Sequence, residues 1–269
     1  ATAATSIRVR RNPGHRVKSF LELATKVAEL QFRNRDHVLL FRGQPGDYRN
    51  KKDNTTLKPT LFRPLKKGNP SSGTLIQRFE TLKQAEQKLV LCYETAGFLG
   101  LNRLKRHRIL RWAILQHYEV CSTPLLDVTA SLRIAASFAS LDHIGQAFIF
   151  VLGVPNLSGA ITASAEAGLQ IVRLSSVCPP SAIRPHIQEG YLLGEYPEMS
   201  AYEQKEQYSH YEIDFGRRLV AKFCFDPKSF WKRDTFPKVK KGDLYPSADD
   251  DRLYKLALDV KESINNTQG

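Results

Sequence analysis

The sequence has few cysteines, and none of them is spaced for a metal site. Cys92, Cys121, Cys178 and Cys224 are far apart, and no pair has the Cys-x-x-Cys spacing of a structural zinc site. A disulfide framework is also unexpected, because a chain of 269 residues that is 42% hydrophobic can bury a sizeable core. We therefore expect reduced, mostly buried thiols, no bound metal and a cytoplasmic protein.

Long apolar runs are also missing. The longest run, residues 147–154, is far shorter than the ~20 apolar residues that a membrane helix needs. The arginines near the N-terminus, Arg8, Arg10 and Arg11, are not followed by an apolar segment, so no secretory signal is visible. These absences predict a protein without a membrane partner.

Acidic residues are outnumbered by basic ones. The chain has 40 Lys and Arg against 27 Asp and Glu, a formal net charge of +13. Such a surplus favours polyanionic partners such as RNA, DNA or a nucleotide, without specifying a sequence. The candidate nucleic-acid contacts are Arg103, Lys105, Arg106 and Arg108. The alternative for this basic set is an ordinary solvated face.

Apolar periodicity predicts a mixture of helices and strands. Helical spacing occupies residues 19–32, 74–99, 103–117, 132–141 and 249–261. Strand patterns occupy residues 37–41, 146–154, 168–174, 191–193 and 218–225. There is no internal repeat, no regular βαβ rhythm and no GxGxxG run, which counts against a Rossmann fold.

This order of elements favours an α+β fold with one compact mixed β-sheet and flanking N-terminal and C-terminal helices. We expect residues 1–16 to be a flexible basic N-terminus and residues 17–269 to form a single domain. Residues 47–73 are rich in Lys, Asn, Pro and Gly, which predicts a mobile loop. Leu57, Leu61 and Phe62 are expected to pin this loop to the core.

The segment from Gln116 to Ser131 places polar residues where a predicted apolar helix ends and an extended segment begins. A helical pattern stops near Val120, and Pro124 then forces an extended start. Polar groups at such a place are costly to bury unless they are hydrogen-bonded or belong to a functional site. His117 has the titration range of a base that Asp127 could orient. The alternative is a core histidine bonded to the Asp127 carboxylate.

Several motifs together resemble a known family. They are Phe41-Arg42-Gly43, residues 57–63 (LKPTLFR), Gln116-His117, residues 123–129 (TPLLDVT), residues 135–139 (AASFA) and residues 184–193 (RPHIQEGYLL). In combination they resemble the FRG domain, a bacterial and phage family named after its Phe-Arg-Gly tripeptide. The resemblance covers roughly residues 37–193.

The same order of motifs is similar, more distantly, to the Arg-Ser-Glu class of ADP-ribosyltransferases. That resemblance implies an ADP-ribosyltransferase-like sheet and NAD as a substrate, with no metal. It assigns Arg42, beside Gly43 and Gln44, to the NAD phosphates, which a guanidinium fork can bind bidentately. Thr129 and Ser131 would line the ribose pocket beside free backbone N–H groups. Helix capping is their alternative role.

The last motif of that class is Glu/Gln-x-Glu, whose final carboxylate stabilises an oxocarbenium ion. Gln188 fits the first place of this motif, and Gly190 stands where the carboxylate belongs. Glycine cannot do this work, so either Glu189 or another carboxylate substitutes, or the chain is not a transferase. The candidate catalytic residues are therefore Gln188, Glu189 and His117.

The leading hypothesis is a NAD-dependent ADP-ribosyltransferase toxin or anti-phage effector that modifies a nucleic acid, with RNA favoured over DNA. A toxin implies a neutralising protein such as an antitoxin. The alternative is a non-catalytic FRG module that binds nucleic acid or a protein partner. A nuclease that uses His117 and Asp127 ranks last, because the sequence has no paired-carboxylate cluster for metal ions.

Overall fold

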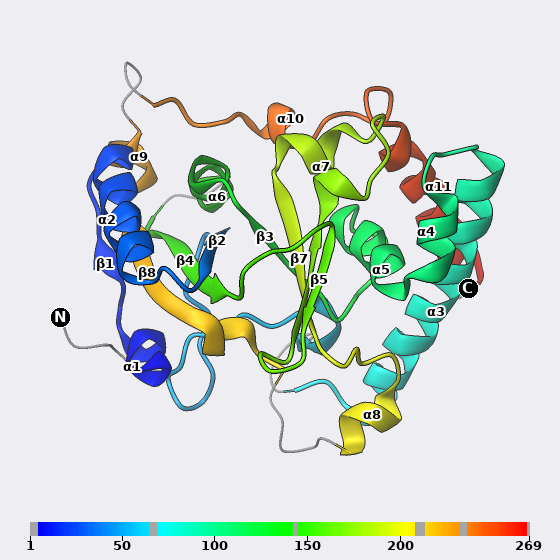
Figure 1. Cartoon of the computed structure of the whole chain (residues 1–269), viewed down its shortest axis with the longest axis horizontal. Coiled ribbons are helices and arrows are strands. Elements are labelled where there is room, and N and C mark those ends of the chain that lie inside the picture. The colour runs from blue at the N-terminus through cyan, green and yellow to red at the C-terminus, as the bar shows by residue number, and fades with distance from the viewer. Residues whose placement is uncertain (1–4, 65–68, 142–144, 208–212, 232–235, 268–269) are drawn as a thin grey trace. The chain divides into compact units, whose positions relative to one another are not determined.

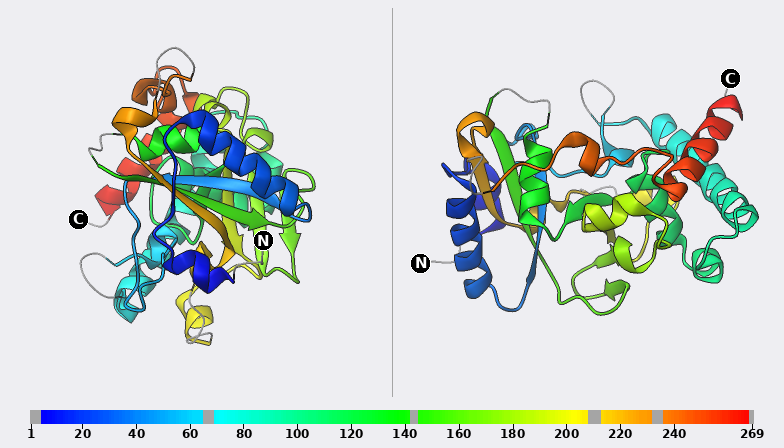
Figure 2. Two further views of the ribbon diagram at one scale, coloured as in Figure 1. Left: turned by 90° about the vertical axis from the view of Figure 1, so that its left-hand side faces the viewer. Right: turned by 90° about the horizontal axis from the view of Figure 1, so that it is seen from above.

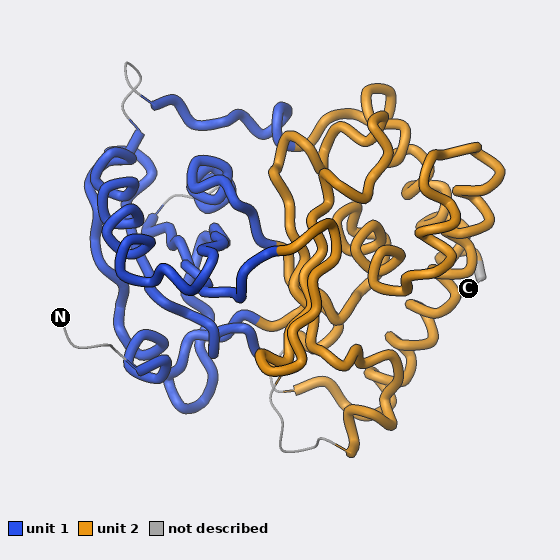
Figure 3. The backbone as a smooth tube through the Cα atoms, viewed as in Figure 1, with its two compact units in different colours: residues 1–57, 128–157, 214–244 blue, residues 58–127, 158–213, 245–269 orange. Residues whose placement is uncertain are grey.

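The computed structural model describes residues 5–64, 69–141, 145–207, 213–231 and 236–267. Helices and strands alternate along the chain, which confirms the mixed α+β class (Figure 1). The fold divides into two compact units (Figure 3). Unit 1 contains residues 1–57, 128–157 and 214–244, and unit 2 contains residues 58–127, 158–213 and 245–269. Each unit is assembled from three separate segments, which is why no linker in the sequence announces a boundary.

Unit 1 is built on a mixed sheet with the strand order β1-β8-β4-β2-β3. The strands are β1 (His15–Arg16), β2 (Val38–Gln44), β3 (Leu126–Thr129), β4 (Ala147–Val154) and β8 (Leu219–Phe225). Strand β2 is antiparallel to both β3 and β4, and β4 is antiparallel to β8. The short strand β1 runs parallel to β8. The second half of β3, Val128 and Thr129, is the part that belongs to unit 1.

Strand β4 lies in the middle of this sheet. Its sequence AFIFVLGV is buried at every position. A continuous apolar run is what a strand covered on both faces requires. The predicted strand 146–154 is therefore confirmed, with Leu152 paired to Leu40 of β2.

Helices cover the sheet of unit 1. They are α1 (Ser6–Arg11), α2 (Phe20–Arg33), α6 (Leu132–Ala139), η3 (Phe215–Arg218), α9 (Pro227–Phe230) and α10 (Lys241–Leu244). Helices α2 and α6 lie on one face of the sheet, and α1 lies on the other (Figure 2). The N-cap Ser19 starts α2 by accepting a hydrogen bond from the backbone N–H of Glu22.

The N-terminal segment is held in place by a buried ion pair, unlike the flexible terminus that the sequence led us to expect. Arg10 of α1 is 7% exposed and pairs with Asp214, which is fully buried. Its Nε also donates to the carbonyl of Thr55 at 2.8 Å. Because the partners of Arg10 lie far away in the sequence, no local pattern could reveal this docking.

Unit 2 combines a three-stranded antiparallel sheet with a group of helices. Its strands are β5 (Ile161–Ser164), β6 (Leu169–Arg173) and β7 (Gly190–Glu195), with β6 between the other two. Its helices are η1 (Thr60–Phe62), α3 (Ser72–Thr95), α4 (Leu101–Arg106), α5 (Arg108–His117), η2 (Leu174–Ser176), α7 (Ile183–Ile187), α8 (Tyr202–Gln207) and α11 (Arg252–Thr267). Helix α3 packs against both α5 and α11.

The core of unit 2 is large and mostly helical. Trp112 of α5 is 1% exposed, and its indole N–H donates to Glu86 Oε1 of α3 at 2.7 Å. Leu61 and Phe62 are buried in the same core, as predicted. Leu57, the third residue expected to pin this loop, is buried in unit 1.

The predicted helix 103–117 is wrong in one respect, because two helices replace it. His107 has an extended backbone (φ −112°, ψ 107°) and separates α4 from α5. The break lets α5 bury Ile109, Leu110 and Trp112 while α4 keeps its cations in solvent. None of the helices in the described ranges is long and apolar enough to cross a membrane.

Candidate functional site

The end of α5 and the start of β3 bring together the polar residues of the central motif. Helix α5 ends at His117, and Glu119 then adopts a left-handed conformation (φ 56°) that reverses the chain. After Pro124 the chain becomes extended and enters β3 at Leu126. This return places Asp127 beside the last turn of α5.

Gln116 is the centre of a hydrogen-bond network in unit 2. Its Oε1 accepts from Thr123 Oγ1 at 2.6 Å and from Thr60 Oγ1 at 2.9 Å. Its Nε2 donates to Asp127 Oδ2 at 2.7 Å. Because both ends of the amide are used, the side chain has one orientation and holds the carboxylate in a fixed place.

Asp127 and His117 form a pair whose outer member is the carboxylate. The Asp127 side chain is 37% exposed and the His117 side chain 3%, with 3.9 Å between Oδ1 and Nδ1. Burial lowers the pKa of His117 below its ordinary value of 6.5. The imidazole is therefore neutral near pH 7, and this contact is not an ion pair. The Nε2 atom of His117 is buried and has no hydrogen-bond partner among the described residues.

Gly190, at the first position of β7, lies against the same imidazole. A Cβ built on Gly190 would come within 3.5 Å of His117 Cε1 and 2.9 Å of Leu174 Cδ1. A side chain at position 190 would therefore require its neighbours to shift. The absence of a glutamate here thus has a steric reason in unit 2.

The Phe-Arg-Gly tripeptide lies in the second half of β2, in unit 1. Arg42 is half-buried and pairs in register with Phe150 of β4. A Cβ on Gly43 would lie 1.8 Å from the carbonyl oxygen of Ala135, so α6 packs on β2 only because this residue is glycine. Gln44 follows, half-buried, with its Oε1 atom buried and without a hydrogen bond from the described residues.

Thr129 and Ser131 build the turn that starts α6, also in unit 1. Thr129 Oγ1 accepts from the backbone N–H of Ser131 at 3.0 Å. Ser131 is the N-cap of α6, where its Oγ receives the N–H of Ile134 at 3.5 Å. The capping role expected for Ser131 is therefore confirmed, and it does not exclude contact with a ligand.

Gln188 and Glu189, the two candidate residues of the last motif, differ in their exposure to solvent. Gln188 is 7% exposed at the C-terminal end of α7, in unit 2. Glu189 is exposed and adopts a left-handed conformation (φ 45°) in the turn before β7. Glu189 thus points its carboxylate into solvent, whereas Asp127 is fixed by Gln116 and lies beside His117.

The basic set of α4 and α5 is exposed but partly neutralised. Lys105 Nζ is 2.8 Å from Glu94, and Arg108 Nε is 3.6 Å from Glu86. Arg103 donates to the carbonyl of Ser176 at 3.3 Å. Within the described part of the chain, Arg106 is the one of the four whose side chain makes no hydrogen bond or ion pair.

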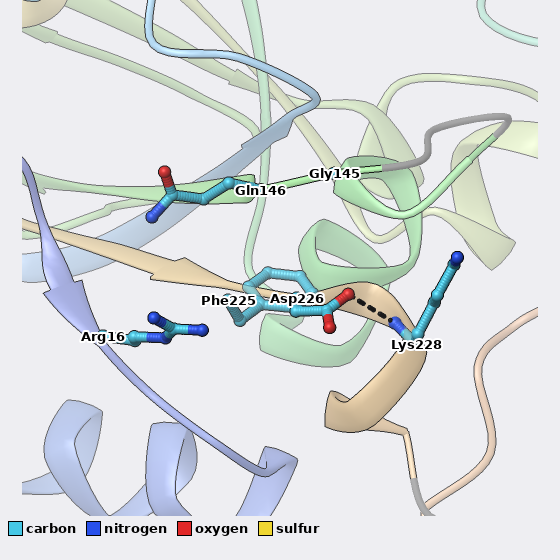
Figure 4. A pocket seen from close by; sticks show the side chains of 6 residues that line it. All are labelled: Arg16, Gly145, Gln146, Phe225, Asp226 and Lys228. Carbon is cyan, nitrogen blue, oxygen red and sulfur yellow. Dashed lines mark hydrogen bonds between the residues drawn. The ribbon is translucent and has the colours of Figure 1, made fainter.

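A shallow pocket in unit 1 lies apart from all of the predicted site residues. It is lined by Arg16, Gly145, Gln146, Phe225, Asp226 and Lys228 (Figure 4). Asp226 accepts the backbone N–H of Lys228 at its edge, so its carboxylate already serves as a helix cap. No group of three or more His, Cys, Asp or Glu side chains that could hold a metal ion occurs in the described parts of the chain.

Sequence reasoning identified His117 and Asp127 but missed the importance of Gln116 and Thr60. Thr60 lies 56 residues before Gln116, and only the folded chain shows that they are bonded. The one available signal was their joint presence in the motifs of residues 57–63 and 116–117.

Comparison with known proteins agrees with these motifs. Residues 37–146 match the FRG domain family, a range that contains β2, Gln116, His117, Asp127 and α6 but not Gln188. No match was found among curated proteins or solved structures. The glycine that admits α6 and the network around Gln116 both lie within the matched range, so residues 37–146 of this chain resemble the FRG domain.

Proposed function

We propose that this protein is a NAD-dependent ADP-ribosyltransferase that modifies a nucleic acid, RNA in preference to DNA, with an ADP-ribosyltransferase-like arrangement of its sheet. In this proposal Asp127 supplies the carboxylate that the last motif lacks. The protein would act in the cytoplasm as a toxin or anti-phage effector, with an antitoxin as its neutralising partner.

The reaction breaks the bond between C1′ of the ribose and the nicotinamide nitrogen of NAD. The electron pair of that bond leaves with nicotinamide and cancels the positive charge of its ring. The ribose is left as an oxocarbenium cation, which a nucleophilic oxygen or nitrogen of the nucleic acid attacks at C1′ before losing its proton. A fixed negative charge near the cation can lower the barrier by several kcal/mol.

The observation that carries the proposal is the position of the Asp127 carboxylate. It is partly open to solvent, and Gln116 holds one of its oxygens at 2.7 Å. It also lies beside the imidazole that packs against Gly190. A carboxylate that is oriented before the substrate arrives stabilises a cation without reorganisation at the moment of reaction.

His117 has a positioning role in this proposal, not the catalytic role expected from the sequence. Its ring is buried and neutral, and it separates Asp127 from the core. Burial lowers the pKa of His117, so the ring beside this carboxylate is an uncharged neighbour near pH 7. The Asp127 side chain is 37% exposed, so a substrate can reach its carboxylate.

The remaining roles follow from the resemblance. Arg42 binds the phosphates of NAD, and Thr129 and Ser131 contact the ribose. Gln188 donates from its amide to a ribose hydroxyl. The exposed Glu189 is the second candidate for the carboxylate.

Incubation with NAD labelled in its adenylate phosphate, together with RNA, DNA or a cell lysate, tests the proposal. We expect label on an RNA acceptor and release of nicotinamide. Absence of transfer to every acceptor, together with intact NAD, would reject it. Arg42→Lys serves as a sensitive variant, because lysine keeps the charge but loses the bidentate fork.

The alternative function is a non-catalytic FRG module that binds nucleic acid or a protein partner. The absence of a carboxylate at position 190 favours it. This alternative predicts salt-sensitive binding to nucleic acid that does not depend on NAD, and no release of nicotinamide.

A further inference from the structure

Three segments of unit 1 present exposed cations close to one another. Helix α1 exposes Arg8 and Arg11, which lie three residues apart and thus on one side of the helix. The turn between Arg49 and Thr55 exposes Lys51 and Lys52. The short helix η3 exposes Arg217. We call Arg8, Arg11, Lys51 and Lys52 the N-terminal basic face.

Hydrogen bonds join these segments into one surface. Arg49 donates to the carbonyl oxygens of Arg11 and Asn12, at 3.2 and 3.1 Å. Arg11 donates from Nε to the side chain of Asn54 at 3.3 Å. Ser6 donates to the carbonyl of Arg217 at 2.8 Å, which ties α1 to η3. The buried pair of Arg10 and Asp214 anchors α1 beneath this surface.

The turn that carries the two lysines is ordered by its own hydrogen bonds. The backbone N–H of Asn50 donates to the carbonyl of Asn54 at 2.9 Å, and that of Asp53 donates back to Asn50 at 2.9 Å. The Asn50 side chain accepts from the backbone N–H groups of Lys52 and Asn54. The lysines therefore project from a fixed turn at its exposed tip.

Carboxylates near this face are already used by other cations. Asp47 lies 2.8 Å from Arg49 and 2.7 Å from Lys222, and Asp53 lies 3.0 Å from Arg49. Arg8, Arg11, Lys51 and Lys52 have no ion pair within the described ranges of the chain. This contrasts with α4 and α5, where Lys105 and Arg108 lie beside glutamates.

We propose that the N-terminal basic face binds the phosphate backbone of the nucleic acid, in place of the basic set Arg103, Lys105, Arg106 and Arg108. Exposed guanidinium forks and lysines gain most from phosphates where no existing ion pair has to break. Contacts of this kind supply affinity and its salt dependence without reading a sequence. The inference rests on the nucleic-acid acceptor of the proposed function, but it requires neither NAD nor transfer.

Two matched variants of the full chain test this inference. The face variant is Arg8→Gln/Arg11→Gln/Lys51→Gln/Lys52→Gln, and the control is Arg103→Gln/Lys105→Gln/Arg106→Gln/Arg108→Gln. Each lowers the formal net charge of +13 by four. Affinity for a short single-stranded RNA and for a DNA duplex is measured without NAD at several salt concentrations.

We expect the face variant to bind about tenfold or more weakly near physiological salt, with a slope of log affinity against log salt that is smaller by roughly 2 to 3. The control should stay within about threefold of the unmodified chain. Equal losses in both variants would mean that only bulk charge matters and would overturn the inference. So would binding to anionic phospholipid vesicles but to neither nucleic acid.

A second pair of variants, each with two substitutions, tests the inference even if the fourfold variants misfold. Lys51→Gln/Lys52→Gln changes only the tip of the turn, and Lys105→Gln/Arg106→Gln is its match on α4. All variants should share the thermal midpoint of the unmodified chain, and the tip pair alone should weaken binding. Release of nicotinamide is followed separately. If nicotinamide is not released although RNA still binds, the transferase proposal is rejected. If the face variant loses RNA binding but still hydrolyses NAD at the normal rate, the proposed role of the N-terminal basic face is supported.

Discussion

The imidazole of His117 lies in van der Waals contact with the position that a Cβ at Gly190 would take. A Cβ on Gly190 would lie 3.5 Å from His117 Cε1 and 3.8 Å from Nδ1. On the same ring, Nδ1 is 3.9 Å from the carboxylate of Asp127. The missing glutamate of the last motif and the carboxylate of β3 therefore border one imidazole, which is the basis for assigning the transferase role to Asp127.

Replacement of Gly43 by alanine should damage unit 1 severely. The added methyl group would lie 1.8 Å from the Ala135 carbonyl, so α6 must move away from β2. We expect a loss of about 3 kcal/mol or more in the free energy of unfolding, measured with urea. Gly73→Ala in α3 is the control, because nothing lies within 4 Å of its added Cβ. That variant should be stabilised by about 0.5–1 kcal/mol. Equal stability of the two variants would refute the tight contact.

Removal of Arg10 should show that the N-terminal helix is part of unit 1. Arg10→Ala removes the buried cation that pairs with the fully buried Asp214, which should cost about 3–5 kcal/mol. Arg8→Ala, two residues earlier on the exposed side of α1, should change stability by less than about 0.5 kcal/mol. Similar small effects for both residues would mean that the ion pair does not hold the helix.

Local sequence patterns predicted the helices and strands whose apolar residues are close together in the sequence. They did not predict features that depend on distant residues. Strand β4 and helix α2 follow directly from residues 146–154 and 19–32. The docking of α1 depends on Arg10 and Asp214, which are 204 residues apart, so its sequence looked like a loose basic tail. The break at His107 has no proline or glycine to announce it.

The candidate site was predicted in the same uneven way. The motifs drew attention to residues 116–131 because polar groups there interrupt an apolar pattern. Which member of the pair is exposed could not be predicted, because exposure depends on β7 and on Gly190 packing against His117. The proposed function accordingly gives the charged role to Asp127 and a positioning role to His117.

Buried His117 should make stability depend on pH. Burial lowers its pKa in the folded chain below the ordinary 6.5, so the unfolded chain binds the proton first as pH falls. This group's contribution is fully present above about pH 6.5 and is lost as pH falls towards the folded pKa. The free energy of unfolding in urea should drop from about pH 7 to about pH 5 more steeply for the unmodified chain than for His117→Gln, by up to about 1.4 kcal/mol per pH unit. Parallel profiles would show that His117 titrates normally.

Two of the four free cysteines should resist alkylation in the folded protein. Burial raises the pKa of Cys121 to about 12 and raises that of Cys178 as well, so neither thiol forms much thiolate at about pH 8. Iodoacetamide should label both at least ~10-fold more slowly in the native chain than in urea, as measured by peptide mass spectrometry. Fast native labelling of Cys178 would contradict its burial.

The most direct test of the central claim is the rate of nicotinamide release from NAD by Asp127→Asn. Asparagine keeps the shape and the contact with Gln116 but removes the negative charge that is proposed to face the cation. Asp259→Asn, an exposed position of α11, is the charge-matched control. We predict a loss of roughly 10²–10³-fold for Asp127→Asn with an unchanged thermal midpoint, and full activity for the control. An Asp127→Asn protein that cleaves NAD as fast as the unmodified chain would contradict the account.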